Sequence, residues 1–84
     1  MIKGFKFYFV PNVRKLVWLA SKANTLVILH ACGTASVGDK TVLLSNGYVM
    51  NSQEAITVRM EKDDELYAIS DTACSLTVLV QEPK

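Results

Sequence analysis

The stretch that decides the fold is A55-I-T-V-R-M-E-K-D-D-E-L-Y-A-I-S-D-T-A-C-S-L-T-V-L-V80. Ile56, Val58 and Met60 alternate with polar residues, which is the period-two pattern of a strand with one face in a core. Charged residues follow, and then two more short apolar runs, L-Y-A-I and L-T-V-L-V. This spacing predicts three β-strands in close succession.

The rest of the chain carries the same signal, because its apolar runs are bounded by Gly, Pro, Asn and Ser. They predict five further strands, at residues 2–10, 14–20, 25–31, 40–45 and 48–50. Since 84 residues are too few for two cores, the whole chain, 1–84, is expected to be one domain. About eight short strands favour an all-β fold, a single small two-sheet β-sandwich of jelly-roll-like type.

Turn chemistry suggests which strands pair. A polar turn at 21–24 joins two similar apolar runs, which predicts a hairpin of 14–20 with 25–31. The consecutive charges at 62–65 are expected at the tip of another hairpin, exposed to solvent.

The remaining connections are expected to be irregular. Residues 33–39 contain two glycines and predict a loop. Asn46-Gly47 predicts a type I′ turn, in which both central residues have positive φ. Residues 1–13 are interpreted as either an N-terminal arm or an edge strand.

Half of the residues are hydrophobic and 20% are charged, which indicates a globular chain. So small a domain cannot bury all of this apolar surface. Exposed apolar area often marks a partner surface or an oligomer interface, so a homo-oligomer is expected.

Charge is distributed unevenly along the chain. Residues 1–42 hold six Lys or Arg against one Asp, whereas residues 43–84 hold three against seven acidic residues, for a formal net charge of +1. The asymmetry indicates either a basic binding arm or two halves that pair within the fold.

The two cysteines, Cys32 and Cys74, are too few and too widely spaced for a zinc site or a redox motif. Each lies in an apolar run beside Ala or Ser, so buried thiols are expected, with a disulfide as the alternative. The sequence therefore predicts no metal site and no cofactor.

The first residues lack the uninterrupted apolar run of a signal peptide. Elsewhere no apolar run approaches the ~20 residues that span a bilayer. Synthesis in a reducing cytoplasm, without a membrane partner, is expected.

Few residues suggest catalysis. His30 is the only histidine and lies within an apolar strand pattern, where a structural position is expected. Residues 62–65 lack the spaced ligands of a calcium loop. Ser70 and Asp71 could complete a triad with His30 only on paper, because no nucleophile elbow surrounds the serine. The chain is therefore expected not to be an enzyme.

Aromatic and basic side chains are interleaved near the start of the chain. They form the predicted partner interface: Lys3, Phe5, Lys6, Phe7, Tyr8, Phe9, Arg14, Lys15 and Trp18. Phenylalanine at every second position is most simply one inward face of a strand, or a protein interface. Aromatic rings beside cations could instead stack bases and hold phosphates. The nearly neutral net charge weighs against nucleic acid.

The C-terminal half contains a series of three motifs. They read T-V-L-L-S-N-G-Y-V-M, then A-I-T-V-R-M-E-K-D-D-E-L-Y-A-I-S, then S-L-T-V-L-V-Q-E. The series resembles small tailed-phage virion proteins, in which a loop ending in N-G-Y precedes an amphipathic strand, a G-D-x-L-Y-A-I-type hairpin and a closing T-V-x-V-L-V strand. The likeness extends from Trp18 to Glu82 and leaves out residues 1–13. One departure is Asp63, which stands where the usual pattern has Gly before the acidic pair.

The resemblance implies a β-sandwich that decorates or cements a capsid, or that belongs to the head–tail or tail structure. The expected function is a non-enzymatic virion structural protein that binds the capsid shell through β-strand and apolar contacts. Its expected partner is the major capsid protein or another virion protein, and its expected location is the virion. The alternative is a small OB-like protein that binds single-stranded nucleic acid.

Overall fold

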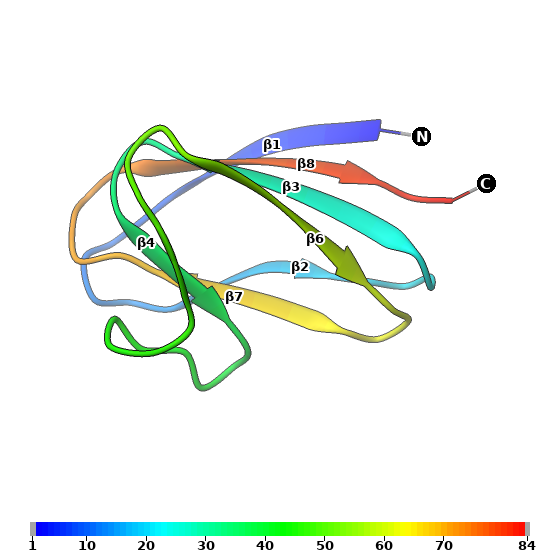
Figure 1. The fold of residues 1–84 in the computed structure, drawn as a ribbon, viewed down its shortest axis with the longest axis horizontal. Coiled ribbons are helices and arrows are strands. Elements are labelled where there is room, and N and C mark those ends of the chain that lie inside the picture. Colours follow the sequence, from blue (N-terminus) through cyan, green and yellow to red (C-terminus); the bar gives the residue numbers. More distant parts are fainter. Residues whose placement is uncertain (1, 84) are drawn as a thin grey trace.

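The fold is built from β-strands. The computed structural model describes residues 2–83, which form eight strands and no helix (Figure 1). The strands are β1 (Ile2–Tyr8), β2 (Lys15–Leu19), β3 (Thr25–Ala31), β4 (Ala35–Gly38), β5 (Tyr48–Met50), β6 (Ala55–Met60), β7 (Glu65–Ile69) and β8 (Ser75–Gln81).

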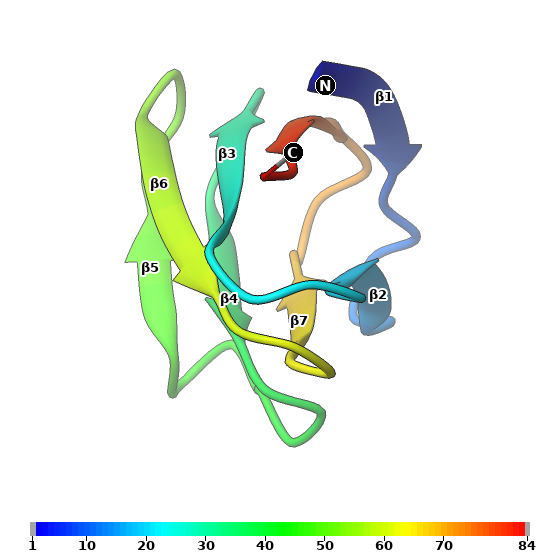
Figure 2. The same ribbon diagram turned by 90° about the vertical axis from the view of Figure 1, so that its right-hand side faces the viewer.

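The strands form two four-stranded antiparallel sheets. Sheet A has the order β1-β8-β3-β6, and sheet B has the order β2-β7-β4-β5. β1 pairs with β8, β2 with β7, β3 with β6 and β4 with β5, as in one long antiparallel ribbon rolled up on itself. The two sheets lie face to face (Figure 2). The predicted two-sheet sandwich of jelly-roll type is therefore confirmed.

The core follows from alternation along the central strands of sheet A. On β3, every second residue from the first to the seventh is buried. Val27 lies opposite Val80 of β8 and Val58 of β6, and Leu29 lies opposite Val78. Burying such side chains contributes roughly 25 cal/mol per Å² of apolar surface removed from water. This apolar row holds the two sheets together.

The predicted hairpin of 14–20 with 25–31 is wrong. β2 belongs to sheet B and β3 to sheet A, so the turn at 21–24 carries the chain across the sandwich. Turn residues reverse the chain locally, whereas the packing of the whole ribbon decides which sheet the next strand joins. Within residues 2–83, β4 and β5 are the only strands consecutive in sequence that pair with each other.

The charged residues 62–65 likewise form a crossover and not a hairpin tip, because β6 and β7 lie in different sheets. Asp63 adopts positive φ (66°), and Glu61 N–H donates to the Asp64 carboxylate (2.9 Å). Asp63 N–H also donates to Ala20 C=O (2.7 Å), and Ala20 N–H donates to Asp64 C=O (2.9 Å). The prediction of an exposed turn is confirmed, but the turn joins the sheets.

The segment after β3 also differs from its prediction. The predicted loop 33–39 contains β4, and the predicted strand 40–45 is an irregular loop. Thr41 donates from its N–H and its hydroxyl to the Asp39 carboxylate (2.8 and 2.6 Å). A side chain that satisfies nearby polar groups in this way competes with a β-ladder.

The loop 39–47 folds over the outer face of sheet B. Val42 is buried there against Gly38, on the side of β4 turned away from the core. Ser36 Oγ donates to Leu44 C=O (3.2 Å) and holds the loop to the strand. An apolar residue is thus buried outside the main core, which explains why this run resembles a strand.

The predicted type I′ turn at Asn46-Gly47 does not form, because Gly47 has positive φ (83°) and Asn46 does not. Asn46 instead accepts a hydrogen bond from Leu43 N–H through its side-chain oxygen (2.9 Å). A Cβ on Gly47 would lie 2.7 Å from both Val37 O and Val42 Cγ2. Backbone conformation and close approach therefore both require glycine.

We predict that Gly47→Ala lowers the free energy of unfolding by at least about 2 kcal/mol, because it adds strain at positive φ and a clash with Val42. Ser45→Ala, an exposed change in the same loop, should stay within about 0.5 kcal/mol. Urea unfolding followed by Trp18 fluorescence measures both. Equal stability of the two variants would contradict the requirement for glycine.

Candidate partner interface

Three of the nine predicted interface residues form an aromatic cluster between the sheets. Phe5 and Phe7 alternate with exposed Lys6 along β1 and pack against the core. The Phe5 ring lies 5.4 Å from the Phe7 ring, at an interplanar angle of 75°, and 5.9 Å from the Trp18 ring of β2. Such contacts are favourable beyond simple burial. The cluster closes the flank where β1 and β2 lie one above the other (Figure 2).

The indole N–H of Trp18 is buried in this cluster and has no hydrogen-bond partner among residues 2–83. Leaving a buried donor unpaired costs about 1–3 kcal/mol.

Lys3, on β1, and Phe9, directly after β1, lie at the two ends of the row of alternate residues that includes Phe5 and Phe7. Phe9 is 3% exposed, so its ring belongs to the core. Its N–H donates to Cys74 C=O (2.8 Å). Lys3 lies opposite Val80 in the register and is exposed. Alternation along the chain shows that these residues share one face, but it does not show how far each side chain is buried.

The other basic residues of the predicted interface lie near sheet B. Arg14 precedes β2 and donates to Lys40 C=O, and Lys15 is half-buried on β2. The ion pair found within residues 2–83 joins Arg59 to Glu61 (3.5 Å), both in the acidic half of the chain. In the described chain the two halves therefore pair through their strands and not through ion pairs.

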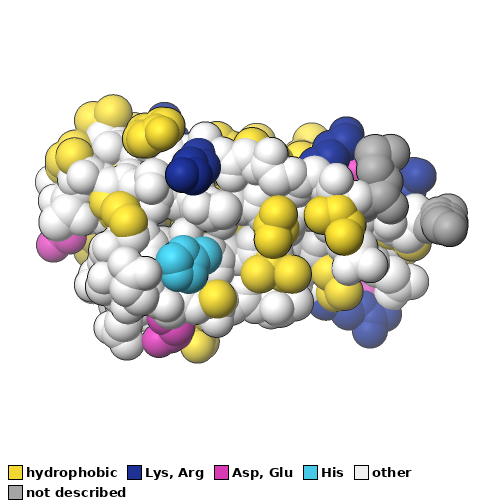
Figure 3. Space-filling model, turned by 90° about the horizontal axis from the view of Figure 1, so that it is seen from above, with side chains coloured by type: hydrophobic (Ala, Val, Ile, Leu, Met, Phe, Trp, Pro, Cys, Tyr) yellow, Lys and Arg dark blue, Asp and Glu magenta, His cyan; other side chains and the backbone are white. Residues whose placement is uncertain are grey.

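The outer face of sheet A, turned away from sheet B, carries an apolar strip. The register places Gly4, Leu79, Ile28 and Thr57 side by side across all four strands. Leu79 is 41% exposed. A Cβ on Gly4 would lie 3.0 Å from Leu79 Cδ2, so the glycine makes room for the leucine. Leu26 extends the strip along β3, and Figure 3 shows apolar side chains gathered on this face.

Polar side chains border the strip. The neighbouring row consists of Lys6, Thr77, His30 and Ala55. Tyr8, two residues further along β1, is highly exposed. Figure 3 shows the histidine and a basic side chain beside the apolar group. An apolar centre with a polar rim is the usual arrangement of a protein interface.

Sequence reasoning named Lys6 and Tyr8, which border the strip, but did not single out Leu26, Ile28 or Leu79. The run 25–31 is apolar on both faces, so its pattern does not say which face is inside. The predicted fold class did hold a signal for these residues. Each sheet of a two-layer sandwich packs only one face against the other sheet, so a strand that is apolar on both faces turns apolar side chains outward.

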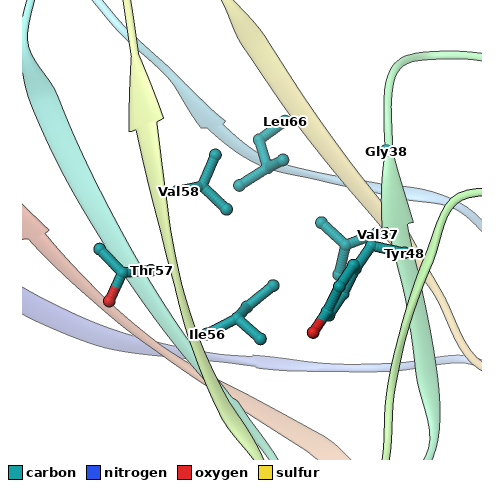
Figure 4. Close-up of a pocket in the computed structure, with 7 residues that line it drawn as sticks. All are labelled: Val37, Gly38, Tyr48, Ile56, Thr57, Val58 and Leu66. Atoms are coloured by element: carbon teal, nitrogen blue, oxygen red, sulfur yellow. The ribbon is translucent and has the colours of Figure 1, made fainter.

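The opposite flank of the sandwich, between β6 and β4–β5, is hollow. A pocket of about 510 Å³ opens there. Ile56 and Val58 point into it from β6, and Val37, Tyr48 and Leu66 line it from sheet B (Figure 4). β6 is an edge strand, so the backbone groups of its free edge run beside the pocket.

Ser70 and His30 do not come together. Ser70 is fully buried and donates to Thr34 C=O (2.7 Å), whereas His30 lies on the outer face of sheet A. Within residues 2–83 no three His, Cys, Asp or Glu side chains are close enough to hold a metal ion. The same range contains no helix long and apolar enough to cross a membrane.

Apart from the cysteines, Tyr67 and Asp39 have shifted pKa values with local causes. Tyr67 OH donates to the Glu65 carboxylate (3.0 Å), and this bond raises the pKa of Tyr67. The hydrogen bonds from Thr41 lower the pKa of Asp39. Both partners lie within two residues of the shifted group, so each shift reflects local structure.

No protein-family model, no curated protein and no solved structure matches this chain. Its own surfaces are therefore what bears on its function.

We predict that Phe5→Ala lowers the free energy of unfolding by roughly 2 kcal/mol, because a half-buried ring leaves the cluster with Phe7 and Trp18. Lys6→Ala, its exposed neighbour on β1, should change stability by less than about 0.5 kcal/mol. Thermal unfolding of both variants checks this. If neither substitution affects stability, residues 1–13 behave as an arm and not as a strand of sheet A.

Proposed function

We propose that this chain is a non-enzymatic virion structural protein of a tailed phage, which binds and decorates or cements the capsid shell. The observation that carries the proposal is the outer face of sheet A, where exposed Leu79 lies beside half-buried Leu26 and Ile28 within a polar border. The likeness of the C-terminal motifs to phage virion proteins supports the choice of assembly.

The exposed apolar surface does not come from an incomplete fold. The chain exposes 4943 Å², and a compact monomer of 9.3 kDa is expected to expose about 5,000 Å². The core between the sheets contains fully buried residues from both, although the flank beside β6 is open at the pocket. Apolar side chains that remain outside a complete core are therefore available to a partner.

The two outer faces of the sandwich differ. The loop 39–47 covers part of the outer face of sheet B, with Val42 buried beneath it. Within the described residues, no such loop covers Leu79 at the middle of β8 in sheet A, which is exposed, although strands of sheet B also expose Leu16 and Val49. The strand β1 lies at the edge of the same sheet, and its free backbone groups can pair with a strand of the major capsid protein or of a second copy.

Nucleic-acid binding is less well supported. An OB-like site needs aromatic rings displayed for stacking beside cations. Here Phe5 and Phe7 turn inward toward Trp18, and Tyr8 with Lys6 remains outside on β1. An OB-fold is a five-stranded barrel, whereas this chain forms two four-stranded sheets.

Particles purified from a culture that expresses the gene in its native genome should contain the chain at a fixed ratio to the major capsid protein. Added to particles that lack it, the chain should bind with an affinity that changes less than about threefold over a tenfold rise in salt, because the contact is mainly apolar. Leu79→Gln should weaken this binding at least about tenfold. Sedimentation through sucrose with quantitative detection measures all three.

Leu44→Gln is the matched control, because Leu44 has the same 41% exposure and lies in the loop 39–47 over sheet B. It should bind within about twofold of the unaltered chain. Failure of the chain to sediment with particles would overturn the proposed function. Tight binding to a random single-stranded oligonucleotide that falls steeply with salt would favour the alternative. Equal loss with Leu79→Gln and Leu44→Gln would exclude the outer face of sheet A as the contact.

A further inference from the structure

The two cysteines, distant in sequence, meet at one end of sheet A. Cys32 directly follows β3 and Cys74 directly precedes β8, and these strands are paired. Cys32 N–H donates to Ser75 C=O (3.1 Å), and Ser75 N–H donates to Cys32 Sγ (2.9 Å). Cys32 Sγ therefore lies against the backbone of the residue that follows Cys74. A Cβ placed on Gly33 would lie 3.4 Å from Cys74 Sγ, which confirms how near the β3–β4 connection runs to that sulfur.

The surroundings of the two thiols differ from the sequence expectation and from each other. Both are free, but Cys32 is exposed and Cys74 is half-buried, whereas two buried thiols were predicted. The hydrogen bond with Cys74 and that from Ser75 lower the pKa of Cys32. Burial raises the pKa of Cys74, and its interaction with Cys32 adds to this. An exposed thiol with stabilised negative charge beside a shielded thiol is the usual arrangement of an attacking and a resolving cysteine.

We propose that Cys32 and Cys74 are a reactive thiol pair that takes a small-molecule disulfide, such as glutathione disulfide, as its oxidant and closes to an intramolecular disulfide. The Cys32 thiolate attacks one sulfur of the oxidant, forms a mixed disulfide and releases one glutathione thiolate. The Cys74 thiolate then attacks Cys32 Sγ, breaks the mixed disulfide and releases the second glutathione. The two protein thiols lose two electrons and two protons, and the oxidant becomes two thiols.

The bond would fasten the end of the sandwich where the chain passes repeatedly between the sheets. Cys32 begins the crossover from β3 to β4, and Cys74 ends the crossover from β7 to β8. Ser70 Oγ already joins these crossovers through Thr34 C=O (2.7 Å). Ser52 Oγ donates to Cys32 C=O (3.0 Å) from the connection between β5 and β6. A covalent link here restrains the unfolded chain while leaving the pairing of β3 with β8 in place.

The test exposes the native, folded chain to increasing ratios of oxidised to reduced glutathione and follows its intact mass. The mass of the unaltered chain should fall by two hydrogen atoms, with no glutathione attached and no disulfide formed between two chains. Cys74→Ser should accumulate a stable glutathione adduct on Cys32. Cys32→Ser should form its adduct on Cys74 at least about tenfold more slowly, because that thiol is shielded. The oxidised chain should unfold about 10 °C or more above the reduced chain.

A stable glutathione adduct on the unaltered chain would overturn the proposal, because Cys74 would then fail to resolve it. Retention of both thiols under strongly oxidising ratios, or a disulfide between two chains, would overturn it as well. If a serine variant fails to fold, partial alkylation of the unaltered chain gives the same comparison. Peptide mapping should then find Cys32 labelled well before Cys74, and equal labelling would contradict the assigned roles.

Discussion

The pairing of β3 with β8 is the interaction on which the rest of the structure depends. These two strands occupy the centre of sheet A, and their inward residues, such as Val27 opposite Val80, supply much of the buried core. Their register leaves β1 and β6 at the edges of the sheet. It places Ile28 beside Leu79 on the outer face, and at its end it brings Cys32 next to Ser75 and Cys74.

The register of β3 with β8 decides which side chains of sheet A enter the core and which form the proposed interface. Side chains of β3 that point inward are buried, and their equally apolar neighbours face outward. The outer face of sheet B differs, since the loop 39–47 covers part of it. The flanks also differ, because Phe5, Phe7 and Trp18 fill one, whereas the other keeps an open pocket beside β6. The sandwich therefore presents chemically distinct surfaces from a nearly symmetric pair of sheets.

Sequence reasoning succeeded for strands in which apolar and polar residues alternate, because only one face of such a strand is buried. The strands of residues 55–80 were predicted because their inward and outward positions differ in polarity. It failed at 40–45, where Val42 is buried on the outer side of sheet B and Asp39 takes up the Thr41 N–H that a ladder would have used. It also failed for the pairing of β2 and β3, because a turn specifies a reversal but not the sheet that the next strand joins.

The sequence by itself determined that this chain forms a small all-β sandwich, and it assigned Lys6 and Tyr8 to the face of β1 opposite its phenylalanines. Those features depend on the polarity of neighbouring residues, which the chain carries in every state. The tertiary structure alone decided that Leu79 would be exposed beside half-buried Leu26 and Ile28, that Phe9 would be buried, and that Cys32 and Cys74 would lie at the same end of sheet A. Each of these depends on contacts between segments far apart in sequence, which exist only once the ribbon has rolled up.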